Sequence, residues 1–225
     1  MRDGFIKTAA CTPLIQVADC RYNAQKILEE LDEAYASGAK LIVFPELCIT
    51  GYTCGDLFWQ DTLLEDAKEA LRRITAHTKG HDGLVFVGVP WEKRGKLYNT
   101  AAVLSNGELI GLVPKHHLPN YNEFYEQRHF SEGTPETEWV TVDGKQVPFG
   151  MDLLFQAVQM EGFTVAAELC EDLWAPKPPS VDHALAGATV IVNLSASDEV
   201  TGKHDYRRAL VSGQSARLLE RKSVG

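Results

Sequence analysis

Apolar runs long enough to cross a membrane are missing from this sequence of 225 residues. A transmembrane helix needs about 20 consecutive, predominantly apolar residues, and no stretch approaches that length. Near the amino terminus, Lys7 interrupts the apolar core that a secretory signal peptide would require. We therefore expect a cytoplasmic protein that has no membrane partner.

Basic charge is also scarce. The 22 lysines and arginines are outnumbered by 31 aspartates and glutamates, which gives a formal net charge of −9. A nucleic-acid-binding protein needs a basic face that neutralises phosphates. Local basic clusters such as Arg207-Arg208 have acidic neighbours that dilute them. We therefore expect no nucleic-acid partner.

The cysteines lack any pairing pattern. There are five of them, an odd number, with neither CxxC pairs nor the spacing of a disulfide framework. Reduced thiols are the simplest interpretation, in keeping with a cytoplasmic location. The adjacent His116 and His117 raise the question of a metal site, but no other His, Cys or acid lies at a zinc-ligand spacing. No metal site is expected.

Several motifs of known chemistry are missing as well. The sequence contains no GxGxxG or GxxxxGK[ST] phosphate loop, no GxSxG nucleophile elbow and no HExxH metal motif. Without a loop that could cradle phosphates, we expect no nucleotide and no other cofactor in this chain.

What the chain does contain is an alternation of strand-like and helix-like segments. Apolar residues follow helical spacing over Tyr22–Ser37 and Asp61–His77, and Leu84–Val89 is a fully apolar strand. The dipeptide Asn106-Gly107 between two further apolar runs predicts a β-hairpin. No linker or repeat divides the chain, so we expect one α/β domain over residues 1–225.

Three strand-like runs end in a residue with catalytic potential. LIVFP precedes Glu46, ELIGLVP precedes Lys115 and FTVAAEL precedes Cys170. In open α/β sheets, ligands bind at the carboxyl ends of the strands. A carboxylate, an ammonium and a thiol at that edge could act as base, electrophilic stabiliser and nucleophile.

Each of these residues also has an ordinary structural explanation. A buried cysteine after a strand is most often a small, inert apolar residue, and the two acids that follow Cys170 should raise the pKa of its thiol. Glu46 could be a solvated acid at a strand end, and Lys115 a surface charge. Taken singly, the three residues leave both interpretations open.

With their neighbours, the three segments resemble a known family. They read FPELCITGY over 44–52, PKHHLPNYNEFYEQRHF over 114–130 and ELCEDLW over 168–174. Together they are similar to the nitrilase, or carbon–nitrogen hydrolase, superfamily, which uses a Glu–Lys–Cys triad in this chain order. The motifs PNYNEFYE, PPS, NLSAS and GQSAR resemble, more narrowly, the glutaminase domains of glutamine-dependent NAD(+) synthetases. The resemblance extends over residues 5–218.

The resemblance implies a four-layer α-β-β-α sandwich, in which two subunits usually stack, and hence a homo-oligomer. Alternating strands and amphipathic helices are compatible with this fold, but they do not distinguish it from a doubly wound sheet.

The resemblance also implies a reaction, the hydrolysis of the side-chain amide of glutamine through a thioester. Cys170 would be the nucleophile and Glu46 the base. Lys115 and the backbone N–H of Glu171 would stabilise the oxyanion. The ammonia would supply NAD(+) synthesis.

Further residues match positions around the substrate in this family. These substrate-binding candidates are Tyr121, Glu126, Glu171, Ser197 and Lys203. Glu126 would position Lys115 or the attacking water, and Tyr121 would line the pocket on the ammonia side. Ser197 and Lys203 would bind the amino-acid end of glutamine, although relatives often have Arg in place of Lys203.

Two departures from the family remain. The ATP-using synthetase domain that accepts the ammonia is absent from this chain, and the glutaminase domain itself is expected to be incomplete after Arg217. We therefore expect weak glutaminase activity and no binding of ATP or NAD. On the last helix, expected over Asp205–Glu220, we expect an uncovered apolar face that promotes association, formed by Ala209, Leu210, Ala216 and Leu219. Two alternatives stay open: an amidase for another small carboxamide, or an inactive fragment that serves as an assembly module.

Overall fold

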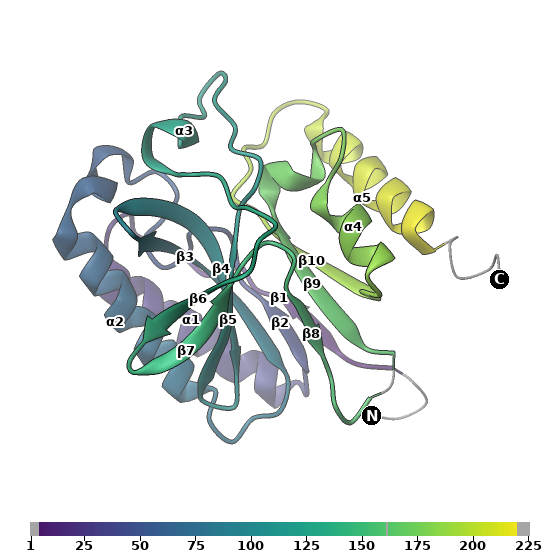
Figure 1. Ribbon diagram of the computed structural model, residues 1–225, viewed down its shortest axis with the longest axis horizontal. Coiled ribbons are helices and arrows are strands. Elements are labelled where there is room, and N and C mark those ends of the chain that lie inside the picture. Colours follow the sequence, from purple (N-terminus) through teal and green to yellow (C-terminus); the bar gives the residue numbers. More distant parts are fainter. Residues whose placement is uncertain (1–4, 161, 220–225) are drawn as a thin grey trace.

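Two β-sheets lie face to face in the computed structural model, and helices cover the outer side of each sheet (Figure 1). The structure describes residues 5–160 and 162–219. The four layers, α-β-β-α, confirm the architecture that the family resemblance implied, as opposed to a doubly wound sheet.

The first sheet has seven strands in the order β1-β2-β3-β4-β5-β7-β6. Strands β1, β2 and β3 are parallel, whereas β4 runs antiparallel to both β3 and β5. Consequently β2 and β5 end at the same edge of the sheet. The strands span Thr8–Ala10 (β1), Leu41–Val43 (β2), Leu84–Lys93 (β3), Lys96–Ser105 (β4), Glu108–Pro114 (β5), Glu138–Val142 (β6) and Lys145–Phe149 (β7).

The second sheet has three strands in the order β10-β9-β8. Strand β8 (Leu154–Gln156) is antiparallel to β9 (Thr164–Leu169), and β10 (Val190–Leu194) is parallel to β9. Helix α4 (Pro179–Leu185) connects β9 to β10, and helix α5 (Lys203–Leu219) follows β10. Both helices lie on the side of this sheet that faces away from the first sheet (Figure 1).

Helices α1 (Cys20–Ala36) and α2 (Asp61–His77) connect the first three strands and cover the outer face of the first sheet. The predicted helix over 61–77 is confirmed to the residue. The predicted helix over 22–37 begins earlier, at Cys20, because the Asp19 carboxylate caps it by accepting a hydrogen bond from Tyr22 N at 2.9 Å.

Two apolar cores hold the four layers together. One core lies between the first sheet and its helices, and the other lies between the sheets. Full burial of a large aliphatic or aromatic side chain contributes about 1.5–3 kcal/mol. Buried members are Ile27, Leu31, Ile74, Val87 and Leu104 in the first core, and Phe86, Val103, Val113, Val165 and Leu194 in the second.

The predicted hairpin joins β4 to β5. Asn106 and Gly107 have φ values of +47° and +83°, which are the left-handed conformations that a two-residue hairpin turn needs. The hairpin reverses the chain so that β5 ends at the same edge of the sheet as β2, where the functional residues were expected.

Helix α5 has no fully buried side chain among its residues whose burial is described. Ala209 and Ala216, on the face that was predicted to be uncovered, are exposed, whereas Leu210 is half-buried. The side chain of Leu219, and Glu220, lie outside the described residues. A cavity of about 1080 Å³ is lined by residues of α5, α4 and β10. None of the helices in the described part combines the length and the apolar character of a membrane span.

The loop after β2 lies directly against β3, at Gly88. A Cβ atom added to Gly88 would be 2.2 Å from Leu47 N and 2.3 Å from Pro45 O, whereas real Cβ atoms keep at least 3.0 Å from such neighbours. Ile49 N also donates a hydrogen bond to Gly88 O at 3.2 Å. Glycine at this position therefore allows the loop that carries Glu46 to reach the sheet.

We predict that Gly88→Ala lowers the free energy of unfolding by about 1–3 kcal/mol, because the added methyl group overpacks the Pro45–Leu47 backbone. The matched control is Gly213→Ala in α5, where the added Cβ would have no heavy atom within 4 Å. This control should gain about 0.5–1 kcal/mol from helix propensity. Urea unfolding measures both values, and a Gly88→Ala protein as stable as the parent would contradict the packing argument.

Candidate active site

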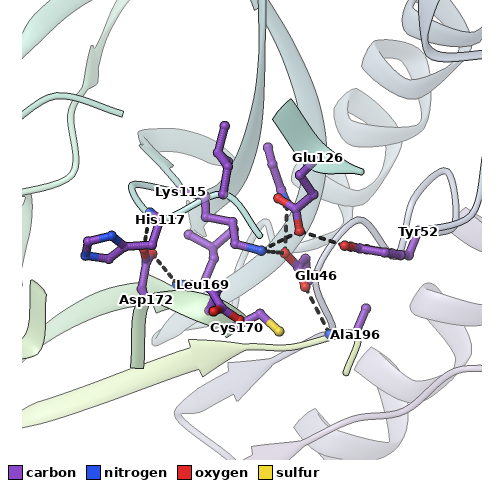
Figure 2. Close-up of polar contacts among 12 residues, drawn as sticks. Glu46, Tyr52, Lys115, His117, Glu126, Leu169, Cys170, Asp172 and Ala196 are labelled. Atoms are coloured by element: carbon purple, nitrogen blue, oxygen red, sulfur yellow. Dashed lines mark hydrogen bonds and ion pairs between the residues drawn. The ribbon is translucent and has the colours of Figure 1, made fainter. Parts of the chain in front are cut away.

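Glu46, Lys115 and Cys170 meet at the edge where strands of both sheets end. They follow β2, β5 and β9. Lys115 Nζ lies 2.7 Å from Glu46 Oε1, and both charges act on the neighbouring Cys170 thiol (Figure 2). The structure therefore brings together the three residues that the sequence singled out.

The Lys115 ammonium lies between two buried carboxylates. Its Nζ is 2.7 Å from Glu46 Oε1 and 2.6 Å from Oε1 of Glu126, the first residue of helix α3 (Glu126–His129). The exposed fractions of Lys115, Glu46 and Glu126 are 0%, 1% and 3%. Since unpaired buried charges are costly, this arrangement depends on all three groups.

Burial and the two neighbouring carboxylates have opposite effects on the pKa of Lys115. Burial alone would lower the pKa of Lys115, but the carboxylates of Glu46 and Glu126 outweigh it and hold that pKa above its ordinary value. Burial and the charge of Glu46 raise the pKa of Glu126 to about 7. Lys115 therefore stays protonated at neutral pH, and Glu126 binds its proton more tightly than an ordinary glutamate does.

Neutral donors complete the hydrogen bonds of the two carboxylates. Asn99 Nδ2 donates to Glu46 Oε1 at 2.7 Å and to Glu126 Oε2 at 3.4 Å. The Tyr52 hydroxyl donates to Glu126 Oε1 at 2.7 Å, and Ala196 N donates to Glu46 Oε2 at 3.1 Å (Figure 2). These contacts fix both carboxylates in place.

Cys170 occupies a strained turn. Its φ is +41°, at the junction of β9 with the short 3₁₀ helix η2 (Cys170–Leu173), and Leu47 directly after Glu46 has a φ of +50°. A non-glycine residue in this region costs on the order of 1–3 kcal/mol, and such strain clusters at functional sites. Both strained residues therefore lie at, or directly after, a residue of the triad.

The Cys170 thiol is protonated in the resting site. Burial and the charge of Glu46 raise the pKa of the thiol to about 12, and Lys115 opposes them. A thiol of this kind becomes a nucleophile when a base removes its proton during the attack. Glu46 is the carboxylate whose charge acts on the thiol most strongly.

A buried carboxylate ties the two sheets together beside the triad. Asp172 Oδ1 accepts hydrogen bonds from His116 N at 3.2 Å and His117 N at 2.7 Å, and its Oδ2 accepts one from Leu169 N at 2.9 Å. Burial raises the pKa of Asp172, and the N–H donors oppose that effect. Asp172 thereby joins the segment after Lys115 to the turn that carries the thiol.

Sequence reasoning missed Asn99, Tyr52 and Asp172 as site residues. A signal was present for two of them, because Asn99 is a polar residue inside the apolar strand LYNTAAVL and Asp172 lies in the turn that follows Cys170. Tyr52 had no comparable signal, since an aromatic residue in a loop is commonly explained by packing.

Three of the remaining predicted residues, Tyr121, Glu171 and Lys203, make polar contacts outside the triad. The Tyr121 hydroxyl donates to Glu171 Oε2 at 2.9 Å, and Tyr121 is 50% exposed. Lys203 forms an ion pair with Asp198. Within residues 5–160 and 162–219, no hydrogen bond or ion pair joins Ser197 or Lys203 to the triad.

The two adjacent histidines have local partners. His116 Nδ1 lies 2.8 Å from Gly133 O, and the rings of His116 and His117 form an edge contact with centroids 4.5 Å apart. Among the described residues, no group of three or more His, Cys, Asp or Glu side chains could hold a metal ion.

Known proteins resemble this chain over most of its length. A family model described as carbon–nitrogen hydrolase matches residues 7–218. The glutamine-dependent NAD(+) synthetase of Mycobacterium tuberculosis is 41% identical over 216 residues, which cover 96% of this chain and 32% of that protein. That of Aquifex aeolicus is 34% identical over 199 residues, with coverages of 88% and 31%. The chain spans about a third of the length of these relatives.

Solved structures show the same likeness. A glutamine-dependent NAD(+) synthetase from Cytophaga hutchinsonii superimposes with a TM-score of 0.84 at 32% identity, over 95% of this chain and 34% of that chain. An amidase from Nesterenkonia sp. superimposes with a TM-score of 0.68 at 19% identity, over 93% of this chain and 73% of that chain. At that identity, the second likeness concerns the fold alone.

We predict that Lys115→Met lowers the free energy of unfolding at pH 8 by about 3–5 kcal/mol, because two buried carboxylates lose their cation. The loss should shrink as the pH falls toward 5. Without the cation, the pKa of Glu126 in the folded protein rises further above its unfolded value, so the stability tied to its proton is present at low pH and is lost as the pH rises.

The matched control is Lys145→Met, which removes an exposed ion pair with Glu108 at 2.8 Å. This variant should change the free energy of unfolding by about 1 kcal/mol or less. Denaturant unfolding between pH 5 and 8 measures both variants. Equal losses in the two, or a loss at Lys115 that does not depend on pH, would contradict the role of the buried ammonium.

Proposed function

Because the chain belongs to the carbon–nitrogen hydrolase family, we propose that the site of Glu46, Lys115 and Cys170 hydrolyses the side-chain amide of glutamine. The observation that carries this proposal is the buried Lys115 ammonium, held at 2.7 Å from Glu46 beside the Cys170 thiol. Amide hydrolysis needs a nucleophile, a base for its proton and a donor for the developing oxyanion, and these groups can supply all three.

The reaction begins when Cys170 Sγ attacks the amide carbon and the thiol proton passes to Glu46. The negative charge that develops on the amide oxygen is stabilised by Lys115 and by the backbone N–H of Glu171. This N–H lies in the first turn of the 3₁₀ helix η2, where a backbone donor has no acceptor within the helix. Glu46 then returns the proton to the departing nitrogen. Ammonia leaves, and a thioester on Cys170 remains.

The second half of the reaction reverses these roles. Glu46 takes a proton from water, and the resulting hydroxide attacks the thioester carbon. The C–S bond breaks, glutamate leaves, and the proton returns to Cys170. Glu126, which shares Lys115 with Glu46 at 2.6 Å, keeps the ammonium oriented through both halves.

The choice of glutamine rests on the relatives, which are named glutamine-dependent NAD(+) synthetases. We propose that the ammonia serves NAD(+) synthesis in a synthetase domain outside residues 1–225. We also propose that this chain works in the cytoplasm as a homo-oligomer and without a cofactor of its own. Tyr121, Glu171, Ser197 and Lys203 remain the proposed contacts to the substrate.

We predict that an electrophilic glutamine analogue such as a diazo-ketone modifies Cys170 and none of the other four thiols. Cys170 is the thiol on which the charges of Glu46 and Lys115 both act. Intact mass and peptide mapping identify the modified residue, and Cys170→Ala is the control. Label on Cys48 or Cys54 would contradict the assignment.

We predict that Glu46→Gln reduces glutamine hydrolysis by about 10²–10⁴-fold, because an amide cannot accept the thiol proton. Glu65→Gln is the matched control, since Glu65 is exposed and pairs with Lys68 on the surface of α2. Release of glutamate is the measurement. Turnover within tenfold of the parent would refute Glu46 as the base, whereas turnover of other amides but not glutamine would favour a different amidase.

A further inference from the structure

The segment that leaves β10 contacts the nucleophile and the base at once. In the parallel pairing of β10 with β9, Leu194 is opposite Leu169, so the next residue on each strand, Ser195 and Cys170, also lie side by side. The Ser195 hydroxyl lies 3.3 Å from Cys170 Sγ and is oriented to donate to it.

The next residue completes this arrangement. Ala196 N donates to Glu46 Oε2 at 3.1 Å and also lies close enough to the Cys170 sulfur to lower the pKa of its thiol. In Figure 2 the side chain of Cys170 points toward the contact between Glu46 and Ala196. The end of β10 therefore faces the path along which the thiol proton must move.

The sulfur needs a donor because the charges around it are unfavourable. The buried cluster holds the carboxylates of Glu46 and Glu126 against the single ammonium of Lys115. Transfer of the thiol proton to Glu46 moves the negative charge of that carboxylate onto the sulfur, while the ammonium remains paired with Glu126. A hydrogen bond becomes stronger when its acceptor is charged, so a hydroxyl on the sulfur stabilises the thiolate more than the thiol.

We propose that Ser195 is a further catalytic residue, whose hydroxyl stabilises the Cys170 thiolate by donating a hydrogen bond to Sγ. In this step the S–H bond of Cys170 breaks, the proton forms an O–H bond with Glu46, and the Ser195 proton stays on its own oxygen. The inference rests on the proposed roles of Cys170 and Glu46, but it concerns the ionisation of the thiol and not the identity of the substrate.

A purely structural role for Ser195 has little support. In the part of the chain that the structure describes, the contact with Cys170 is the one hydrogen bond of its side chain. Ser195 is exposed and lines the cavity between α5 and β10. Replacing its hydroxyl therefore removes neither a buried anchor nor a core contact, and the variants should fold.

The test is the rate at which iodoacetamide alkylates Cys170 between pH 7 and 9, resolved by peptide mapping. Loss of a hydrogen bond to a charged acceptor should raise the pKa of the thiol by about one to two units. The thiolate that remains is more nucleophilic, which offsets part of this loss. We therefore expect alkylation of Ser195→Ala to be about 3- to 10-fold slower.

The direction of the change in alkylation rate distinguishes loss of the hydrogen bond to the sulfur from easier access of the reagent. Ser195→Ala removes an atom beside the sulfur, so easier access of the reagent would speed alkylation. Ser195→Thr keeps the hydroxyl and should restore the parent rate. Ser212→Ala, at an exposed serine of α5, should leave the rate unchanged. If Ser195→Ala does not fold, Ser195→Gly also lacks the hydroxyl and should be slowed equally.

An alkylation rate in Ser195→Ala that equals or exceeds the parent rate would overturn the proposal, as would equal slowing in the Ala and Thr variants. Glutamine turnover is measured in parallel, where kcat should fall and KM should stay the same. A parent protein that does not hydrolyse glutamine would refute the proposed substrate, whereas the alkylation rates alone decide the role of Ser195.

Discussion

One ammonium group makes this site possible. Glu46 and Glu126 are both buried at the rim of the sandwich, and Lys115 Nζ is within 2.7 Å of each. Two carboxylates this close cannot both be ionised in a poorly solvated site without a cation. The position of Lys115 at the end of β5 thus determines where the loop after β2 and the start of α3 can lie, since each carries one of the carboxylates.

The backbone conformation around this ion cluster also helps to bring the site residues together. Gly88 lets the loop with Glu46 approach β3, and left-handed φ values at Leu47 and Cys170 turn the chain sharply after two of the strands. Asp172 then joins the turn of the second sheet to the segment after Lys115 in the first. Conformational strain and buried polar groups lie where the two sheets share a rim, and the two apolar cores below them supply the stabilisation that offsets their cost.

The same burial decides how the thiol can react. With a pKa raised to about 12 by burial and by Glu46, Cys170 holds its proton until a base accepts it during the attack. In the proposed reaction, activation of the nucleophile is therefore coupled to proton transfer, and a donor near the sulfur would affect its rate. The site therefore differs from one in which the thiolate is already formed. In the proposed reaction, the Ser195 hydroxyl and Ala196 N at the end of β10 act on the ionisation of this thiol.

Much of this protein follows from local patterns in the sequence. Helix α2, the hairpin at Asn106 and the strand ends that carry Glu46, Lys115 and Cys170 follow from apolar periodicity and turn residues, which depend on neighbours in the chain. Family motifs then indicated the sandwich and the role of Glu126. Asn99 and Asp172 could not be assigned in this way, because each is a polar residue whose partners lie in segments far from it in the chain. The sequence by itself therefore determined which residues stand at the strand ends. The packing of the two sheets against each other decided which of these residues are buried together, because burial and the pairing of charges arise from contacts between segments far apart in the chain.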